Sequence, residues 1–217
     1  MSRAFLKKIL VRGKIYSNVH CPLSTVTNVL LCAYNAKRGD LMLIETDYDR
    51  RAAVRYALNW AFARNPRFYD FENIGGDCTN FVSQCMYAGC GVMNYSPEDG
   101  WYYINSDDRA PAWTGVNFLR EFLFTNRGPG VYGEEAPLSE LRRGDIIQLI
   151  NSSGRFYHTV FISAILRPVT PENIFVCAHS VDARNRRLSS YNYADTMGIH
   201  IIGARKQLTV EPDVIDN

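Results

Sequence analysis

The period of the hydrophobic residues changes along the chain, and this change limits the possible folds more than any other feature. Between residues 47 and 128, apolar residues recur at three- and four-residue steps, which predicts helices over 48–64 and 78–88 and a third helix from Thr114. After residue 144 the period shortens, and four runs favour strands: 145–150, 156–165, 173–179 and 198–207. Helices followed by strands predict an α+β fold with an antiparallel sheet.

The length and composition favour one main domain. The chain has 217 residues, of which 47% are hydrophobic, so it can bury a substantial core. We expect this domain over residues 46–217. Residues 1–45 form an N-terminal extension of unknown role, because no clear period runs through them.

The charges argue against a nucleic-acid partner. The 24 Lys and Arg residues and the 22 Asp and Glu residues are interspersed, so no concentrated basic face is predicted. Short basic clusters occur at Lys7-Lys8 and at Arg184, Arg186 and Arg187. Clusters of this size are typical of solvated surface.

Neither a membrane span nor a secretory signal is predicted. The longest apolar stretch near the N-terminus, residues 29–34, is far below the roughly 20 residues of a spanning helix, and the apolar run 9–11 is interrupted at once by Arg12. The six cysteines include no Cys-x-x-Cys pair, so we expect no metal, no cofactor and a reducing, cytoplasmic location. The even number of cysteines leaves disulfides open, and an external role at the cell wall also stays open.

Cys78 differs from the other cysteines because it begins a predicted helix directly after Gly-Gly-Asp. The helix dipole and free N–H groups there favour a thiolate, and they can lower a thiol pKa from about 8.5 to roughly 3.5–7.5. The backbone N–H groups of Asp77 and Cys78 could also stabilise the oxyanion of a tetrahedral intermediate. In the alternative interpretation, Cys78 is a buried apolar residue on the same helix face as Val82 and Cys85.

A nucleophilic thiol needs an imidazole that accepts its proton. His158 and His179 lie near the ends of consecutive predicted strands, and their mean position, 168.5, falls at the turn between them. In an antiparallel hairpin the two side chains could be cross-strand neighbours, with His158 as the base and His179 orienting it. A register slip of one residue would separate them, and Asp182 is the alternative third residue. Without Cys78, a strand-end histidine bound to backbone would be the preferred interpretation of His158.

The long polar segment from residue 91 to residue 113 carries several aromatic residues, among them Trp101 and Trp113. Such a loop often lines a binding groove. The two tryptophans are therefore candidates for a substrate groove, and the equally weighted alternative is that their rings pack on the core.

The sequence resembles the bacterial putative amidase domain family over roughly residues 47–190. The resemblance is carried by the run Gly75-Gly76-Asp77-Cys78-Thr79-Asn80-Phe81-Val82-Ser83-Gln84, by Leu141 to Gln148, and by His158-Thr159 and Ala178-His179-Ser180. That family is assigned to the papain-like cysteine hydrolase superfamily, which includes the NlpC-like and CHAP-type cell-wall hydrolases. The resemblance implies a papain-like (NlpC-like) fold with Cys78 as nucleophile, His158 as base and His179 as third polar residue. It also implies a peptide or peptidoglycan-derived substrate.

The favoured function is hydrolysis of an amide or peptide bond through a thioester on Cys78. Two alternatives share the same fold. One is an inactive module that binds a glycan or peptide, and the other is an acyltransferase that passes the acyl group to an amine.

Overall fold

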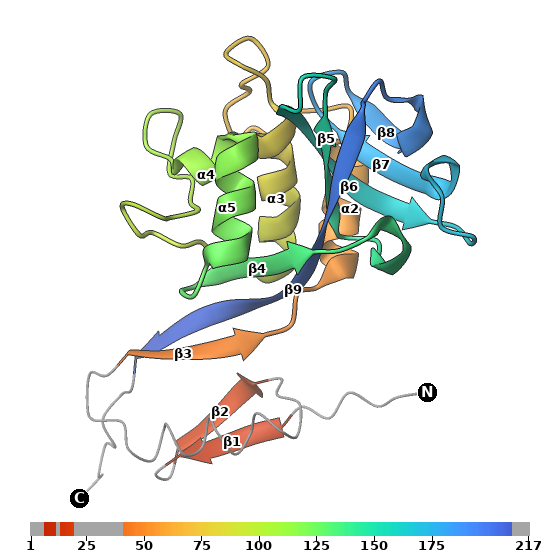
Figure 1. Cartoon of the computed structure of the whole chain (residues 1–217). Coiled ribbons are helices and arrows are strands. Elements are labelled where there is room, and N and C mark those ends of the chain that lie inside the picture. The colour runs from red at the N-terminus through yellow and green to blue at the C-terminus, as the bar shows by residue number, and fades with distance from the viewer. Residues whose placement is uncertain (1–6, 12–13, 20–40, 210–217) are drawn as a thin grey trace, which may run out of the picture.

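The structure is a computed structural model that describes residues 7–11, 14–19 and 41–209 (Figure 1). The helices are α2 (Arg50–Trp60), α3 (Cys78–Cys90), α4 (Pro111–Thr114) and α5 (Val116–Thr125), and three short 3-10 helices are η1 (Leu138–Glu140), η2 (Pro171–Asn173) and η3 (Leu188–Ser190). The strands are β1 (Lys7–Val11), β2 (Lys14–Val19), β3 (Leu41–Thr46), β4 (Gly130–Glu135), β5 (Ile146–Ile150), β6 (Phe156–Ile165), β7 (Ile174–Ala178), β8 (Ala183–Arg187) and β9 (Asp195–Thr209).

Within these residues the main sheet has seven antiparallel strands in the order β3-β9-β5-β6-β7-β8, and β4 also pairs with β9. β1 and β2 form a separate antiparallel hairpin. The expected α+β class with an antiparallel sheet is therefore confirmed. No helix in the described part of the chain is long and apolar enough to cross a membrane.

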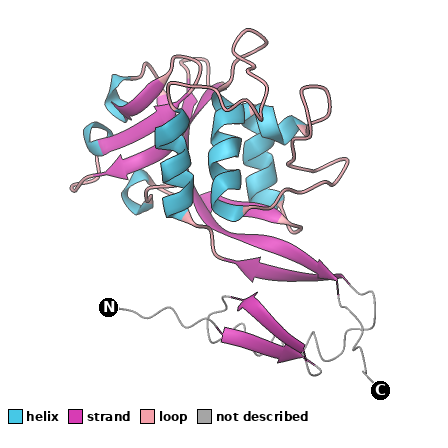
Figure 2. Cartoon of the chain, turned by 180° about the vertical axis from the view of Figure 1, so that it is seen from behind, coloured by secondary structure: helices cyan, strands magenta, loops and turns pink. Residues whose placement is uncertain are grey.

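The helices cover one face of the sheet (Figure 2). Alternate residues of a strand point to opposite faces, so each central strand contributes to two clusters of buried side chains. Ile146 and Phe161 pack with α2, α3 and α5, whereas Ile147 and Val160 belong to a second cluster with Leu188. The position of a side chain along β5, β6 or β7 thus decides whether it faces the helices.

Local sequence signals determine the ends of the two long helices. Asp49 caps α2, because its carboxylate accepts hydrogen bonds from the backbone N–H groups of residues 51 and 52. α3 continues two residues beyond the predicted end and stops at Gly91, which adopts a left-handed conformation. Gly89 lies inside α3 because it packs against Tyr48, where a Cβ atom would lie 2.3 Å from a ring carbon.

The strand predictions for 145–150, 156–165, 173–179 and 198–207 correspond to β5, β6, β7 and β9. Five of the described strands were not predicted, namely β1, β2, β3, β4 and β8. The expected domain boundary at residues 45 and 46 falls inside β3, whose residues pair with β9. The third predicted helix corresponds to α5, although Gly115, which is extended, caps it in place of Thr114, and the short helix α4 before it was not predicted.

Candidate active site

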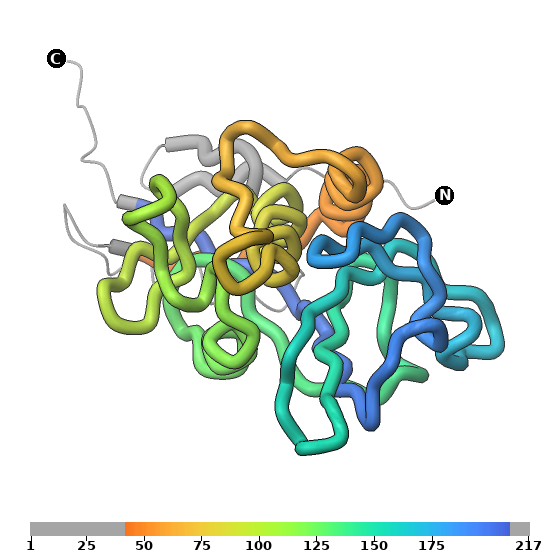
Figure 3. The backbone as a smooth tube through the Cα atoms, turned by 90° about the horizontal axis from the view of Figure 1, so that it is seen from above, coloured from red at the N-terminus to blue at the C-terminus, as the bar shows by residue number. Residues whose placement is uncertain are grey.

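Cys78 is the first residue of α3, and the residue before it holds the surrounding segments together. The buried carboxylate of Asp77 accepts hydrogen bonds from the backbone N–H of Phe71 and from the side chain of Asn80, at 3.0 and 2.7 Å. Its second oxygen lies 2.5 Å from Nδ1 of His179. One carboxylate therefore joins the loop before α3, the helix itself and the end of β7. Seen from above, this loop lies beside the segment that follows β7 (Figure 3).

The thiol of Cys78 lies against β6. Its Sγ atom is 3.7 Å from Oγ1 of Thr79 and contacts the backbone of Thr159, and the side chain is only 7% exposed. Burial raises the pKa of the thiol above its ordinary value, although hydrogen bonds from Thr159 and Thr79 act in the opposite direction. The predicted lowering of this pKa is wrong for this structure, because loss of solvent outweighs the favourable position at a helix N-terminus.

His158 directly precedes Thr159 on β6. It therefore lies one residue from the strand position that the thiol contacts. Thr159 points toward α3, where its hydroxyl lies 3.3 Å from that of Thr79. Strand alternation turns His158 toward the second cluster, where its ring centroid is 5.8 Å from that of Tyr191. Among the described residues, no side chain or backbone group forms a hydrogen bond with the ring nitrogens of His158. The structure thus shows no hydrogen bond between Cys78 and His158.

His158 is buried, with 6% of the residue exposed. Burial, together with the positive charge of Arg186, lowers its pKa from 6.5 to about 4. The ring is therefore neutral at pH 7, as a general base must be before it accepts a proton. A neutral thiol and a neutral imidazole, and not a thiolate and an imidazolium, form the resting state.

His179 was predicted to orient His158, but in the structure it contacts other groups. Its Nδ1 faces Asp77, its Nε2 lies 2.9 Å from the carbonyl oxygen of Trp60, and its ring stacks on Phe81 with centroids 4.0 Å apart. β6 and β7 pair Phe161 with Cys177, which is a register one residue away from the one that would place His158 opposite His179. The expected contact between the two histidines is therefore absent from this structure.

Two other groups that were predicted to take part in the site form hydrogen bonds elsewhere. Asp182 accepts two hydrogen bonds from Arg64, at 3.0 and 2.9 Å, so it does not orient His158. The backbone N–H of Asp77 donates to the hydroxyl of Ser180 at 2.7 Å, and this bond makes it unavailable to an oxyanion in this structure. The N–H of Cys78 remains the candidate for that role.

Trp101 and Trp113 do not line a groove. Both rings are fully buried, with centroids 4.9 Å apart. Their indole N–H groups donate to Ser83 and Asn80, which lie on α3. The core-packing interpretation is correct, since a buried indole with a satisfied N–H is a stable way to fill the space behind a helix.

Sequence reasoning missed several residues around the site. Arg64 is one of them, and it forms ion pairs with the carboxylates of Asp70, Glu72, Asp77 and Asp182. Its partners lie up to 118 positions away, so no local pattern could reveal them. Tyr191 was also missed, because it belongs to no periodic run. In the described ranges no group of three or more His, Cys, Asp or Glu side chains could hold a metal ion.

Comparison with known proteins adds family membership to this geometry. Residues 47–202 match the model of the family described as putative amidase domain. The chain belongs to this family. The matched residues include α2, α3 and the sheet strands that surround Cys78 and His158.

A curated relative of this putative amidase domain protein is the uncharacterized protein YhbB of Bacillus subtilis (strain 168), which is 31% identical over 142 residues. The alignment covers 64% of this chain and 43% of the relative, so the chain spans less than half of that protein's length. No solved structure matches.

Proposed function

We propose that this protein is a cysteine-dependent hydrolase of amide or peptide bonds with a papain-like, NlpC-like domain that includes β3 and the rest of the main sheet. The observation that carries the proposal is the contact between the Cys78 thiol and the β6 backbone at Thr159, the residue that directly follows His158, whose imidazole is neutral. Membership of the putative amidase domain family supports amide hydrolysis as the reaction class.

In the proposed reaction, His158 takes the thiol proton and the sulfur attacks the substrate carbonyl. The resulting oxyanion is stabilised by the N–H of Cys78 at the start of α3. When the carbon–nitrogen bond breaks, the imidazolium gives its proton to the departing amine, and a thioester remains on Cys78. Water, deprotonated by His158, then hydrolyses the thioester and regenerates the thiol.

This reaction requires a change of side-chain rotamer. In the resting structure the sulfur contacts the β6 backbone at Thr159 and the imidazole packs beside Tyr191, so the proposed reaction needs a χ1 rotation of Cys78 or His158 to bring them within hydrogen-bond distance. Catalytic hydrogen bonds often form only in the complex with substrate. His179 contributes by fixing Asp77, and hence the start of α3, through the 2.5 Å contact.

The substrate class we propose is a peptide or a peptidoglycan-derived peptide. The proposal rests on the resemblance to cell-wall hydrolases. It places the reaction either in the cytoplasm, on imported or recycled peptides, or at the cell wall.

The proposed function is tested by release of amines from peptides and peptidoglycan fragments. Cys78→Ala should reduce the rate on the order of a thousandfold or more, because it removes the attacking atom. Cys90→Ala is the matched control, since Cys90 is equally buried at the other end of the same helix. Unchanged activity in Cys78→Ala would rule out the proposed nucleophile.

One observation favours a second candidate, a binding module without turnover. The thiol is buried, its pKa is raised, and the described residues include no hydrogen bond from it to an imidazole. A protein of this kind would bind peptides with the same affinity as its Cys78→Ala variant and would never form a thioester. Intact-mass measurements during incubation with substrate distinguish the two candidates.

A further inference from the structure

Three polar side chains meet on the sheet face that points away from α3, and one of them carries a buried hydroxyl without a hydrogen-bond partner among the described residues. The hydroxyl of Tyr191 is buried and makes no hydrogen bond within the described residues. The neighbouring imidazole of His158 is also buried, with ring centroids 5.8 Å apart. Buried polar groups nearly always have partners, so this place lacks a polar ligand.

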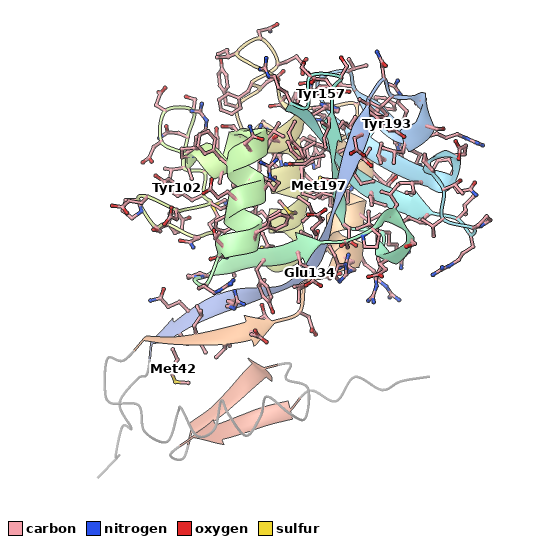
Figure 4. The ribbon with its side chains drawn as sticks, in the orientation of Figure 1. Met42, Tyr102, Glu134, Tyr157, Tyr193 and Met197 are labelled. Carbon is pink, nitrogen blue, oxygen red and sulfur yellow. The ribbon has the colours of Figure 1, made fainter. Side chains whose placement is uncertain are left out.

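Arg186 is the third group. Its Cζ atom lies 4.0 Å from the centroid of the Tyr191 ring, so the guanidinium and the imidazole contact the same phenol. The β7–β8 register pairs Arg186 with Val176, a member of the second cluster, which places the arginine on the same face as His158. Figure 4 labels Tyr157, which precedes His158 on β6, and Tyr193, which lies two residues after Tyr191 in the segment before β9, in the upper part of the molecule.

The guanidinium of Arg186 is held in place but has no counterion. Nε and one terminal nitrogen each donate to Ser190 at 2.8 Å, and the guanidinium also acts on the Tyr191 hydroxyl, where it favours a lower pKa of the phenol against the larger effect of burial. Arg50, Arg64 and Arg205 all form ion pairs, whereas no carboxylate in the described part of the chain lies within 4.0 Å of Arg186. A fixed guanidinium beside a phenol hydroxyl offers converging donors, and carboxylates are the anions that match this geometry.

We propose that Arg186 and Tyr191 bind a carboxylate of the substrate, and that the amide cleaved lies one or two residues from a free C-terminal carboxylate. The inference rests on the proposed function, which makes His158 the group that protonates the departing amine. Because Arg186 and Tyr191 lie beside His158, the proposal places them on the side of the site that meets the departing amine. The His158 centroid and the Arg186 Cζ atom lie 5.8 Å and 4.0 Å from the centroid of the same Tyr191 ring, and an extended residue spans at most about 3.6 Å, so one or two residues bridge the base and the guanidinium.

Binding to the Cys78→Ala variant tests the inference without turnover. The probes are N-acetyl-Ala-Ala-Ala with a free carboxylate and the same tripeptide with a C-terminal amide, compared by isothermal titration calorimetry. The free acid should bind more tightly. Arg186→Gln should weaken binding of the acid by about tenfold or more and should leave the affinity for the amide unchanged. Tyr191→Phe should also weaken binding of the acid, but by a smaller factor.

Arg187→Gln is the matched control. Arg187 carries the same charge on the same strand, but it pairs with Phe175 and its guanidinium lies over that ring, on the opposite face. The Arg187→Gln variant should bind the acid and the amide as tightly as the protein with Arg187 does. Equal binding of acid and amide, no binding of either, or equal losses in the Arg186 and Arg187 variants would overturn the proposal. A preference for the acid without cleavage by the wild-type protein would refute the hydrolase and retain the carboxylate site.

Discussion

His158 and Cys78 show how burial changes the chemistry that their sequence positions suggest. A helix N-terminus favours the thiolate, yet the thiol pKa is raised because the sulfur is removed from water. Burial likewise keeps the imidazole neutral, with a pKa of about 4. Both effects favour a resting site without charges.

The pKa of His158 predicts a pH dependence of stability. Because it is lowered from 6.5 to about 4 in the folded state, the unfolded chain binds more protons between these pH values. The stabilisation is fully present above about pH 6.5 and is lost as the pH falls toward 4, with a total of about 3 kcal/mol. His158→Gln should remove this part of the slope. Urea unfolding of both proteins at pH 4.5 and pH 7 measures it, and parallel pH dependences would contradict the assignment.

At the scale of elements, the buried pair of Asp77 and His179 joins the start of α3 to the end of β7. Both side chains are 1% exposed, so loss of either partner leaves a buried polar group without compensation. Asp77→Asn and His179→Gln should each lower the free energy of unfolding by about 3 kcal/mol.

The double variant should cost less than the sum of the two single variants, with a coupling of about 1 kcal/mol or more. Chemical denaturation of the four proteins measures this coupling. Additive losses would show that the two residues act independently and would remove the proposed positioning role of His179.

The elements with a clear hydrophobic period could be predicted from the sequence, and the contacts between them could not. The runs at β5, β6 and β7 were found because their residues are buried in regular patterns. β8 was missed, since Ala183–Arg187 is mostly exposed and charged. The pairing of His158 with His179 failed by one residue of register, and hairpin arithmetic cannot detect such a shift.

For the whole molecule, the pairing of β3 with β9 extends the main sheet into residues assigned to the N-terminal extension. Ile44 on β3 is 6% exposed, whereas its neighbour Leu43 is 41% exposed. Ile44→Ala should therefore destabilise the protein by about 2 kcal/mol or more, and Leu43→Ala by less than about 1 kcal/mol. Thermal unfolding of both variants checks this. Equal, small effects would show that β3 contributes nothing to the domain.

The most direct test of the catalytic assignment is the detection of an acyl group on Cys78. After brief incubation with p-nitrophenyl acetate, peptide mapping by mass spectrometry should find acetylation at Cys78 in the wild-type protein. The labelling should be at least about a hundredfold slower in His158→Ala, because the base that takes the thiol proton is missing. Absence of the acetyl group from Cys78, or labelling at the same rate without His158, would contradict the assignment of these two residues.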